Sequence, residues 1–234
     1  MDTLIITLDG PAGSGKSTVA RQLAARLGMV FLDTGAMYRG LTAHCLDLGI
    51  DPAREPQRVA ALAASVQMSF DWQRDPPRLL IDGHDMDRRL RDPDTTAHVS
   101  NVAAIAKVRH RLVEQQRQIV RCHRRLVSDG RDQGSIVFPD AQIKFYLDAD
   151  PAVRARRRAA QLTAAGQPAD EQQLLDQIVR RDTRDSLRSD GPLICPLDAV
   201  RIDTSQMTLD QVVCCLETKV KQQIRLKRAS EAGK

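Results

Sequence analysis

Residues 10–17 read GPAGSGKS and fit the spacing G-x-x-x-x-G-K-[ST]. Glycines at these positions let a turn wrap its backbone around an anion, and the start of a following helix adds partial positive charge. Lys16 supplies a full charge at the β- and γ-phosphates of a nucleotide, and the hydroxyl of Ser17 is placed to hold Mg²⁺. The residues that this motif is expected to place around the phosphates are Gly10, Pro11, Ala12, Gly13, Ser14, Gly15, Lys16 and Ser17.

The flanks of this loop have the pattern that the motif requires. An apolar, β-prone run beginning at Leu4 is typical of a buried parallel strand, and Val19, Leu23 and Leu27 recur at helical spacing after the loop. A Gly-rich turn with a chance lysine is the alternative, and it does not account for both flanks. Asp129 ends a later predicted strand beside the loop, a position from which an Asp typically orders Mg²⁺ through water.

Arginines cluster near the predicted ends of other strands. They occur at Arg131, at residues 154–158 and at residues 181–188. The planar guanidinium group suits phosphate, and transfer between two phosphorylated molecules brings like charges together that dense cationic contacts must offset. This density predicts a site that holds several phosphates at once. For residues 154–158 taken alone, a solvated, salt-bridged helix face explains the arginines equally well.

Five short strands alternate with helices along the chain. The strands are predicted from Leu4, at 29–32, 126–129, 143–147 and 199–203, and helices from Ala36 and at 51–66, 95–106, 108–120, 151–162, 174–187 and 209–220. This alternation after a P-loop predicts an α/β protein with the three-layer α/β/α P-loop NTPase fold and a five-stranded parallel sheet.

Three further local features follow from the sequence. Alternating residues at 68–72 and 78–82, a turn at Asp82-Gly83 and a third strand near 85–86 predict a small antiparallel sheet inserted into the core. Thr34 is expected to cap the helix that follows it. The tail after Lys227 is small and polar, and we expect it to be frayed.

The bulk composition excludes several classes of protein. The chain has 234 residues with 42% hydrophobic and 28% charged residues, and 35 basic against 30 acidic residues give a net charge of +5. This charge is too mild to indicate nucleic-acid binding, and 3% aromatic residues provide no stacking platform. No apolar run approaches the ~20 residues of a membrane helix. We therefore expect a cytoplasmic protein with no leader segment, no membrane contact and no nucleic-acid partner.

Four blocks of the sequence resemble the bacterial cytidylate kinases. They are ITLDGPAGSGKST at 6–18, LDTGAMYRG at 32–40, SDGRDQGSIVFPDAQIKFYL at 128–147 and RRDTRDSLRSDGPL at 180–193. Many P-loop enzymes share the first block, whereas the third is far more specific. The likeness runs from Leu4 to about Val220 without a large gap.

The resemblance implies a single nucleoside monophosphate kinase domain over residues 1–234. We separately expect the protein to be a monomer. Its core is expected at 1–50, 107–150 and 190–227, a monophosphate-binding insertion at about 51–106, and a helical lid at about 151–189. The fold that the resemblance implies is the same three-layer α/β/α fold that the pattern of strands and helices predicts.

The resemblance also implies roles for individual residues. Thr34 and Arg39 would face the acceptor nucleotide, Ser100, Arg109 and Asp132 would read the cytosine edge, and Arg131 would contact the acceptor phosphate. Arg181 and Asp185 would bind the ribose with Arg188 nearby, and Arg154, Arg157 and Arg158 would lie on or near a mobile lid. The phosphates of ATP would be held by the residues from Gly10 through Thr18. The expected catalytic residues are Lys16, Arg131, Asp132, Arg157 and Arg158, and the expected metal-binding residues are Ser17 and Asp129. Gln133 stands where an apolar residue is expected.

The predicted reaction is transfer of the γ-phosphoryl group of ATP·Mg²⁺ to the phosphate of CMP or dCMP. The acceptor oxygen is already anionic, so positioning and charge neutralisation suffice without a strong general base. Three alternatives stay open. A kinase of the same fold could act on UMP, AMP or shikimate, a P-loop NTPase could work without an acceptor, and a basic nucleic-acid-binding protein could carry an incidental P-loop.

Overall fold

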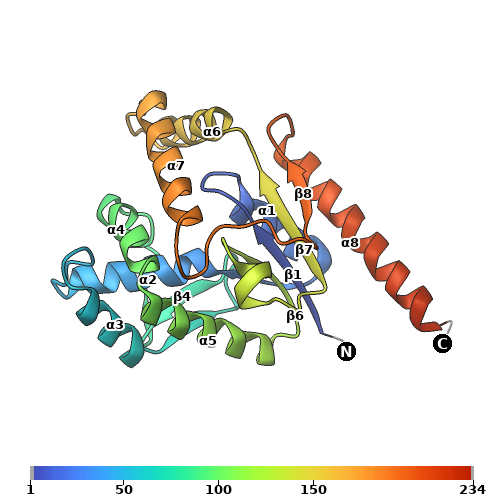
Figure 1. Cartoon of the computed structure of the whole chain (residues 1–234), viewed down its shortest axis with the longest axis horizontal. Helices are drawn as coiled ribbons and strands as arrows, with labels where there is room; N and C mark the ends of the chain where they lie inside the picture. The colour runs from blue at the N-terminus through green and yellow to red at the C-terminus, as the bar shows by residue number, and fades with distance from the viewer. Residues whose placement is uncertain (1–2, 233–234) are drawn as a thin grey trace.

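A five-stranded parallel sheet forms the centre of the protein in the computed structural model, which describes residues 3–232 (Figure 1). Its strands are β1 (Leu4–Asp9), β2 (Val30–Asp33), β6 (Arg125–Asp129), β7 (Ile143–Asp148) and β8 (Val200–Asp203). The order across the sheet is β2-β6-β1-β7-β8. Because β1 lies between β6 and β7, the loop after it emerges beside the carboxyl ends of both neighbours.

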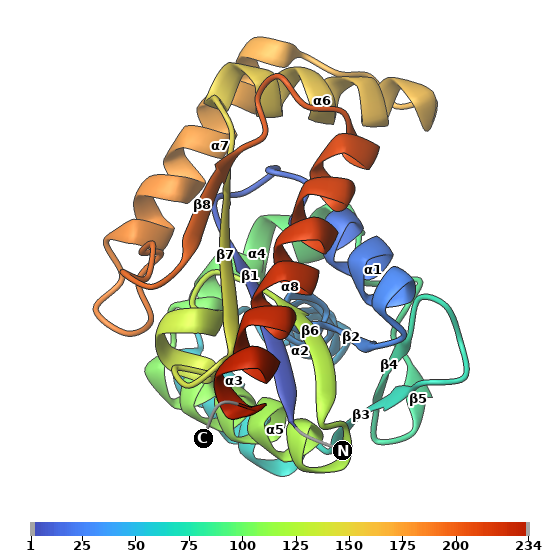
Figure 2. The same cartoon turned by 90° about the vertical axis from the view of Figure 1, so that its right-hand side faces the viewer.

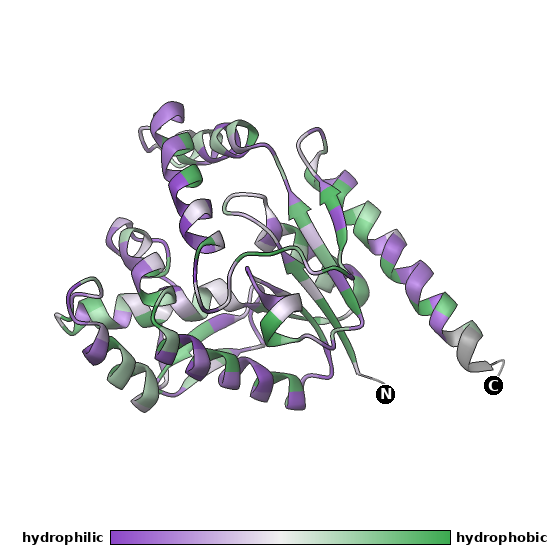
Figure 3. Cartoon of the chain, viewed as in Figure 1, coloured by the Kyte–Doolittle hydropathy of each residue, from purple (hydrophilic) through white to green (hydrophobic). Residues whose placement is uncertain are grey.

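Helices cover both faces of the sheet, which confirms the predicted three-layer fold. They are α1 (Lys16–Leu27), α2 (Thr34–Asp47), α3 (Pro56–Ser65), α4 (Pro93–Ala103), α5 (Ala106–Cys122), α6 (Pro151–Ala164), α7 (Glu171–Ser186) and α8 (Leu209–Ala232). Ile6 and Leu8 of β1 pack with α1 and α8, whereas Ile5 packs with α5 on the opposite face. Successive strand side chains point to opposite faces, so a continuous apolar run serves a strand covered on both sides, as the hydropathy of the strands in Figure 3 illustrates.

A small antiparallel sheet is inserted between α3 and α4, as predicted. It consists of β3 (Met68–Asp71), β4 (Arg78–Ile81) and β5 (His84–Asp85) in the order β3-β4-β5. Asp82 and Gly83 form the turn between β4 and β5. The sheet packs on α2 at Gly40, where a Cβ atom would lie 2.3 Å from Cδ2 of Leu79. This close approach joins the insertion to the core.

Helices α6 and α7 form a hairpin that extends beyond the carboxyl end of the sheet (Figures 1 and 2). The chain enters α6 from β7 and leaves α7 along a loop toward β8. Ile178 of α7 lies close to the P-loop. A Cβ atom built on Gly13 would be 3.8 Å from Cδ1 of Ile178. The hairpin thus contacts the loop that follows β1.

Some local expectations are wrong. The side chain of Asp33, rather than Thr34, caps α2 by accepting a hydrogen bond from the N–H of Ala36 at 2.8 Å. Helix α8 continues to Ala232, so the tail that was expected to fray is helical; its sequence contains no glycine or proline that would stop a helix before that point. Strand β5 begins one residue earlier than predicted.

A short π-helix, η1 (Gln133–Val137), follows β6 and has no counterpart in the sequence-based expectations. Over residues 3–232, no helix has both the length and the apolar character required to cross a lipid bilayer. The predicted absence of membrane contact stays a prediction, because this finding concerns helices alone.

Candidate active site

The P-loop between β1 and α1 has the backbone conformation that its glycines permit. Gly10, Gly13 and Gly15 have φ angles of +145°, +74° and +83°. A Cβ on Gly10 would also lie 2.0 Å from the carbonyl oxygen of Leu147 on β7, so this position requires glycine for space as well as for its φ angle. Helix α1 begins at Lys16, and its first N–H groups are available to an anion.

The Lys16 side chain is folded into the P-loop. Its Nζ atom donates to the carbonyl oxygen of Pro11 at 2.6 Å and to Oγ of Ser14 at 3.2 Å, and the residue is only 4% exposed. Burial and then the nearby charge of Arg131 lower the pKa of Lys16 well below its ordinary value. An anion in the loop would relieve both effects, since it supplies the missing negative charge.

Ser17 and Asp129 meet where α1 begins and β6 ends. The Ser17 hydroxyl donates to Oδ2 of Asp129 at 2.5 Å, while Oδ1 of Asp129 is buried without a hydrogen-bond partner among the residues that the structure describes. Burial, followed by the charge of neighbouring Asp33, raises the pKa of Asp129. A buried carboxylate oxygen without a partner calls for a cation, and hydroxyl and carboxylate oxygens are suitable ligands for Mg²⁺. These residues therefore fit the expected metal ion.

Four arginines lie beside the P-loop together with the carboxylates of Asp33 and Asp185. Asp185 of α7 pairs with Nε of Arg131 at 3.0 Å and with Nη2 of Arg188 at 3.1 Å. The Nε atom of Arg181 is buried without a partner, and burial and the charge of Arg131 lower the pKa of Arg181 to about 10. The charge of Arg39 acts in the same direction. This excess of partly buried positive charge favours binding of an anion.

Arg39 and Thr34 lie at the start of α2. Arg39 forms an ion pair with Asp33 at 3.1 Å and retains 27% side-chain exposure. The Thr34 hydroxyl donates to the backbone carbonyl of Asp129 at 2.7 Å, and Thr34 is 2% exposed. Arg39 is thus accessible to a ligand, whereas the hydroxyl of Thr34 joins α2 to the end of β6.

Arg109 and Asp132 form a buried ion pair next to the arginine cluster. Arg109 is 2% and Asp132 4% exposed, and Nη2 of Arg109 donates to Oδ2 of Asp132. Asp190 lies 3.8 Å from Nε of Arg109. Gly191 has a φ of +62°, and a Cβ there would lie 1.7 Å from Nη2 of Arg109. The α7–β8 loop therefore closes tightly over this pair.

The third residue expected to read cytosine, Ser100, is half-buried on α4. The same helix meets α7 where Nη1 of Arg188 donates to the carbonyl oxygen of Ala103 at 3.5 Å. Elements far apart in the sequence thus meet around the Arg109–Asp132 pair.

The structure does not bring the three α6 arginines into this cluster. Arg154 is buried and donates to backbone carbonyls, including that of Ala12 in the P-loop. Nη2 of Arg157 donates to the carbonyl oxygens of Thr204 and Met207, beyond β8. Arg158 is exposed and reaches Gln161 on its own helix. The catalytic roles expected for Arg157 and Arg158 stay predictions that require a change in these contacts.

Comparison with known proteins gives a consistent result. The sequence profile described as cytidylate kinase matches residues 6–222. The chain belongs to the cytidylate kinase family. It is 46% identical over 210 residues to the cytidylate kinase of Corynebacterium efficiens, a match that covers 90% of this chain and 91% of that protein. It is 43% identical over 225 residues to that of Mycobacterium avium, covering 96% and 98% respectively.

Membership of the cytidylate kinase family confirms the resemblance seen in the sequence and the prediction of a phosphotransferase. Among solved structures, an uncharacterized protein from Eubacterium ventriosum superposes with a TM-score of 0.51 at 12% identity, covering 94% of this chain and 99% of that one. At this identity, the likeness concerns the fold alone.

Two polar residues, Asp9 and Gln133, support the site although no role was predicted for them from the sequence. Asp9, at the end of β1, accepts hydrogen bonds from the N–H groups of Gln133 and Gly134 at 2.8 and 2.7 Å. Gln133 is 1% exposed and accepts a hydrogen bond from Ser128, which accounts for a polar residue at a position where an apolar one was expected. The position of Asp9 at the end of a predicted strand was a signal that could have identified it. The hydrogen-bond partners of Gln133, in contrast, become neighbours only when the chain folds.

Proposed function

We propose that this protein transfers the γ-phosphoryl group of ATP to CMP or dCMP, with the donor in the P-loop and the acceptor phosphate at the arginine cluster. The observation that carries this proposal is the half-buried side chain of Arg181. Its buried Nε atom has no hydrogen-bond partner within residues 3–232, and it lies among the charges of Arg131 and Arg39. A phosphate placed there faces the P-loop lysine, because the charge of Arg131 also acts on Lys16.

The donor side consists of residues 10–18. The backbone N–H groups at the start of α1 and the ammonium group of Lys16 bind the β- and γ-phosphates. Ser17 and Asp129 hold Mg²⁺, which neutralises charge on the phosphates when it is bound. In this account, Lys16 exchanges the carbonyl oxygen of Pro11 for phosphate oxygens.

The acceptor side consists of Arg39, Arg131 and Arg181, which bind the phosphate and the adjoining ribose together with Asp185 and Arg188. Since the attacking phosphate oxygen is already anionic, these side chains position it in line with the γ-phosphate and offset the repulsion between the two substrates. Thr34 holds the start of α2 against β6, so that Arg39 is presented from a fixed helix.

The Arg109–Asp132 pair and Ser100 read the base. A carboxylate accepts a hydrogen bond from the 4-amino group of cytosine, whereas the carbonyl group of uracil at the same position would be repelled. The tight closure of Gly191 over Arg109 fixes the geometry of the pair. This arrangement favours CMP over UMP.

The remaining parts of the proposal concern the whole chain. The insertion at about 51–106 helps to enclose the monophosphate, and the lid at about 151–189 excludes water during transfer, with Arg157 and Arg158 contacting the phosphates after closure. We further propose that the protein is a monomer in the cytoplasm. Light scattering of the purified protein tests its oligomeric state, and cell fractionation tests its location.

A screen of acceptors tests the function directly. Purified protein with ATP and Mg²⁺ is assayed for ADP release in the presence of CMP, dCMP, UMP, AMP or shikimate. We expect strong stimulation by CMP and dCMP and weak stimulation by the others. Release of ADP that is independent of every acceptor would support a simple NTPase instead, and preference for another acceptor would overturn the assignment of the base-reading residues.

A further inference from the structure

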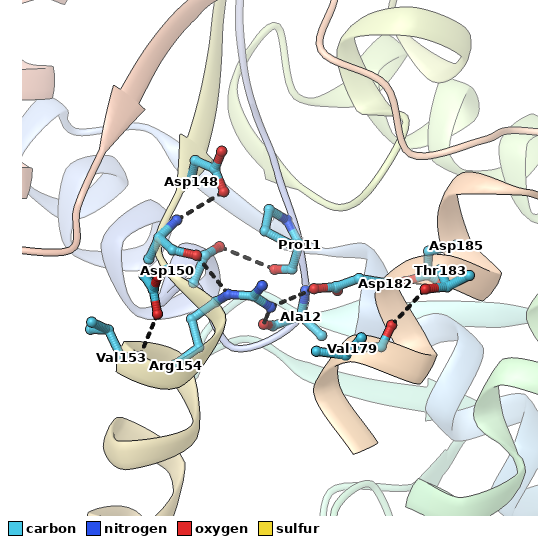
Figure 4. A network of polar contacts seen from close by, with 12 residues as sticks. Pro11, Ala12, Asp148, Asp150, Val153, Arg154, Val179, Asp182, Thr183 and Asp185 are labelled. Atoms are coloured by element: carbon cyan, nitrogen blue, oxygen red, sulfur yellow. Dashed lines mark hydrogen bonds and ion pairs between the residues drawn. The ribbon is translucent and has the colours of Figure 1, made fainter. Parts of the chain in front are cut away.

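Helices α6 and α7 hold both backbone polar groups of Ala12 in the P-loop (Figure 4). The carbonyl oxygen of Ala12 accepts a hydrogen bond from Nη1 of Arg154 at 2.7 Å, and its N–H group donates to Oδ1 of Asp182 at 2.9 Å. Nη1 of Arg154 also lies 2.6 Å from Oδ2 of Asp182. These three residues, one from the P-loop and one from each helix, are called the Ala12 clamp below.

The clamp is buried and anchored to the sheet. Arg154 is 3% exposed, and its Nε atom donates to the carbonyl oxygen of Ala149, just after β7, at 2.9 Å. The side chain of Asp182 is 19% exposed. A buried guanidinium group requires a charge partner and hydrogen bonds. Arg154 keeps its ion pair with Asp182 and its hydrogen bond to Ala12 only while the P-loop and α7 keep their present positions. The clamp therefore makes the positions of the loop and the two helices depend on one another.

Asp182 lies on α7 between residues that face the acceptor side. Arg181 precedes it, and Asp185, one turn later, pairs with Arg131. One turn of α7 thus contacts the donor loop through Asp182 and the arginine cluster through its neighbours. A shift of the P-loop by less than a hydrogen-bond length would be felt at Arg181, since backbone and helix are packed rigid elements.

We propose that the Ala12 clamp couples the two substrate sites, so that ATP in the P-loop tightens binding of CMP and CMP tightens binding of ATP. Arg154 and Asp182 are positioning residues in this scheme, because they touch the loop and the helix and not the substrates. The inference rests on the proposed function, which places the donor in the P-loop and the acceptor next to α7. We call the ratio of CMP affinities with and without bound ATP the coupling factor. Thermodynamic linkage requires that CMP raise the affinity for ATP by the same factor.

Calorimetric titration of CMP into the full-length protein, with and without a non-hydrolysable ATP analogue and Mg²⁺, measures this factor. For the wild type we expect CMP to bind more tightly with the analogue present, by a factor in the range of about 5 to 150 that site-to-site couplings commonly show. In Arg154→Lys and Asp182→Asn, the factor should fall toward one while CMP binding without the analogue changes little. Reversing the order of addition should give the same factors.

Matched controls are available on the same two helices. Arg156 of α6 and Asp176 of α7 are exposed, so Arg156→Lys and Asp176→Asn should keep the wild-type factor. Thermal unfolding identifies variants that are folded at the temperature of titration. If Arg154→Lys is unfolded, the nearly isosteric Asp182→Asn decides the test.

The outcomes separate the clamp from the function. A coupling factor that is unchanged in both clamp variants, or a wild type without coupling, would overturn the clamp while CMP phosphorylation by the wild type still supported the function. A wild type that neither binds nor phosphorylates CMP would overturn the proposed function itself, and the clamp proposal with it.

Discussion

Replacing Asp132 by Asn changes the base-reading pair at its carboxylate while preserving the size of the side chain. In the wild type, Asp132 can only accept hydrogen bonds, which matches the 4-amino group of cytosine. An Asn side chain can also donate from its amide, and so it tolerates the carbonyl group of uracil. One well-placed contact of this kind is worth about 1–3 kcal/mol of discrimination, or about 5- to 150-fold in relative rate.

Because the pair is buried, this substitution also lowers the stability of the protein. Asp132 and Arg109 are both almost inaccessible. Within residues 3–232, the change leaves Arg109 with Asp190, 3.8 Å from Nε, as its only ion-pair partner. Breaking a buried pair by removing one charge costs about 3–5 kcal/mol of stability, and an Asn that still accepts one hydrogen bond should cost less. Kinetics must therefore be measured at a temperature at which a melting curve shows the variant to be folded.

A coupled ADP-release assay gives kcat/KM for CMP and UMP in the wild type and the variant. The CMP-to-UMP ratio should fall by about 5- to 150-fold, while KM for ATP stays unchanged because Asp132 is not part of the P-loop. Asp140 is exposed and follows the π-helix η1, which begins directly after Asp132. As a matched control, Asp140→Asn should leave the CMP-to-UMP ratio unchanged. A folded Asp132→Asn protein that discriminates as well as the wild type would refute the base-reading role.

Three other changes test separate parts of the account. Lys16→Met removes the buried ammonium group and should lower kcat by about 10²- to 10³-fold, as loss of one charge-stabilising donor does, and near-normal turnover would exclude the phosphate-binding role. Gly191→Ala should raise KM for CMP and leave KM for ATP unchanged, because the added Cβ would displace the Arg109 guanidinium; equal changes in both constants would contradict this reasoning. Burial raises the pKa of Asp9 from 3.8 to about 6, so the native state binds extra protons between these pH values and the free energy of unfolding declines as pH rises through them, by at most about 1.4 kcal/mol per pH unit. The free energy of unfolding of Asp9→Asn, measured with urea at several pH values, should lack this decline with pH. If the decline were the same as in the wild type, a group other than Asp9 would be responsible for it.

The sequence predicts the sheet and the donor loop well because their signals are local. The apolar run at Leu4, the three P-loop glycines and the helical spacing after them each reflect a constraint that acts within a few residues. The antiparallel insertion was also predictable, since the Asp82-Gly83 turn fixes the pairing of β4 and β5. The predicted ends of helices were less accurate. Helix α8 extends beyond its predicted end because helix-forming residues continue past the last clear apolar position.

The acceptor side could be predicted only in part, because its residues interact across long stretches of sequence. The resemblance to the family named Arg109 and Asp132, yet their burial and the closure of Gly191 over them depend on the loop after α7. The arginines of α6 illustrate the limit most clearly. Spacing on a helix indicated a cationic face, whereas Arg154 in fact binds the backbone of the P-loop, and no local pattern identifies a carbonyl group 142 residues away as its partner.

Determination of a crystal structure with a non-hydrolysable ATP analogue, Mg²⁺ and CMP bound tests the central claim most directly. We expect the analogue's terminal phosphate next to Lys16 and the CMP phosphate within hydrogen-bond distance of Arg39, Arg131 and Arg181. A complex in which CMP binds elsewhere, or in which these three guanidinium groups point into solvent, would contradict the account.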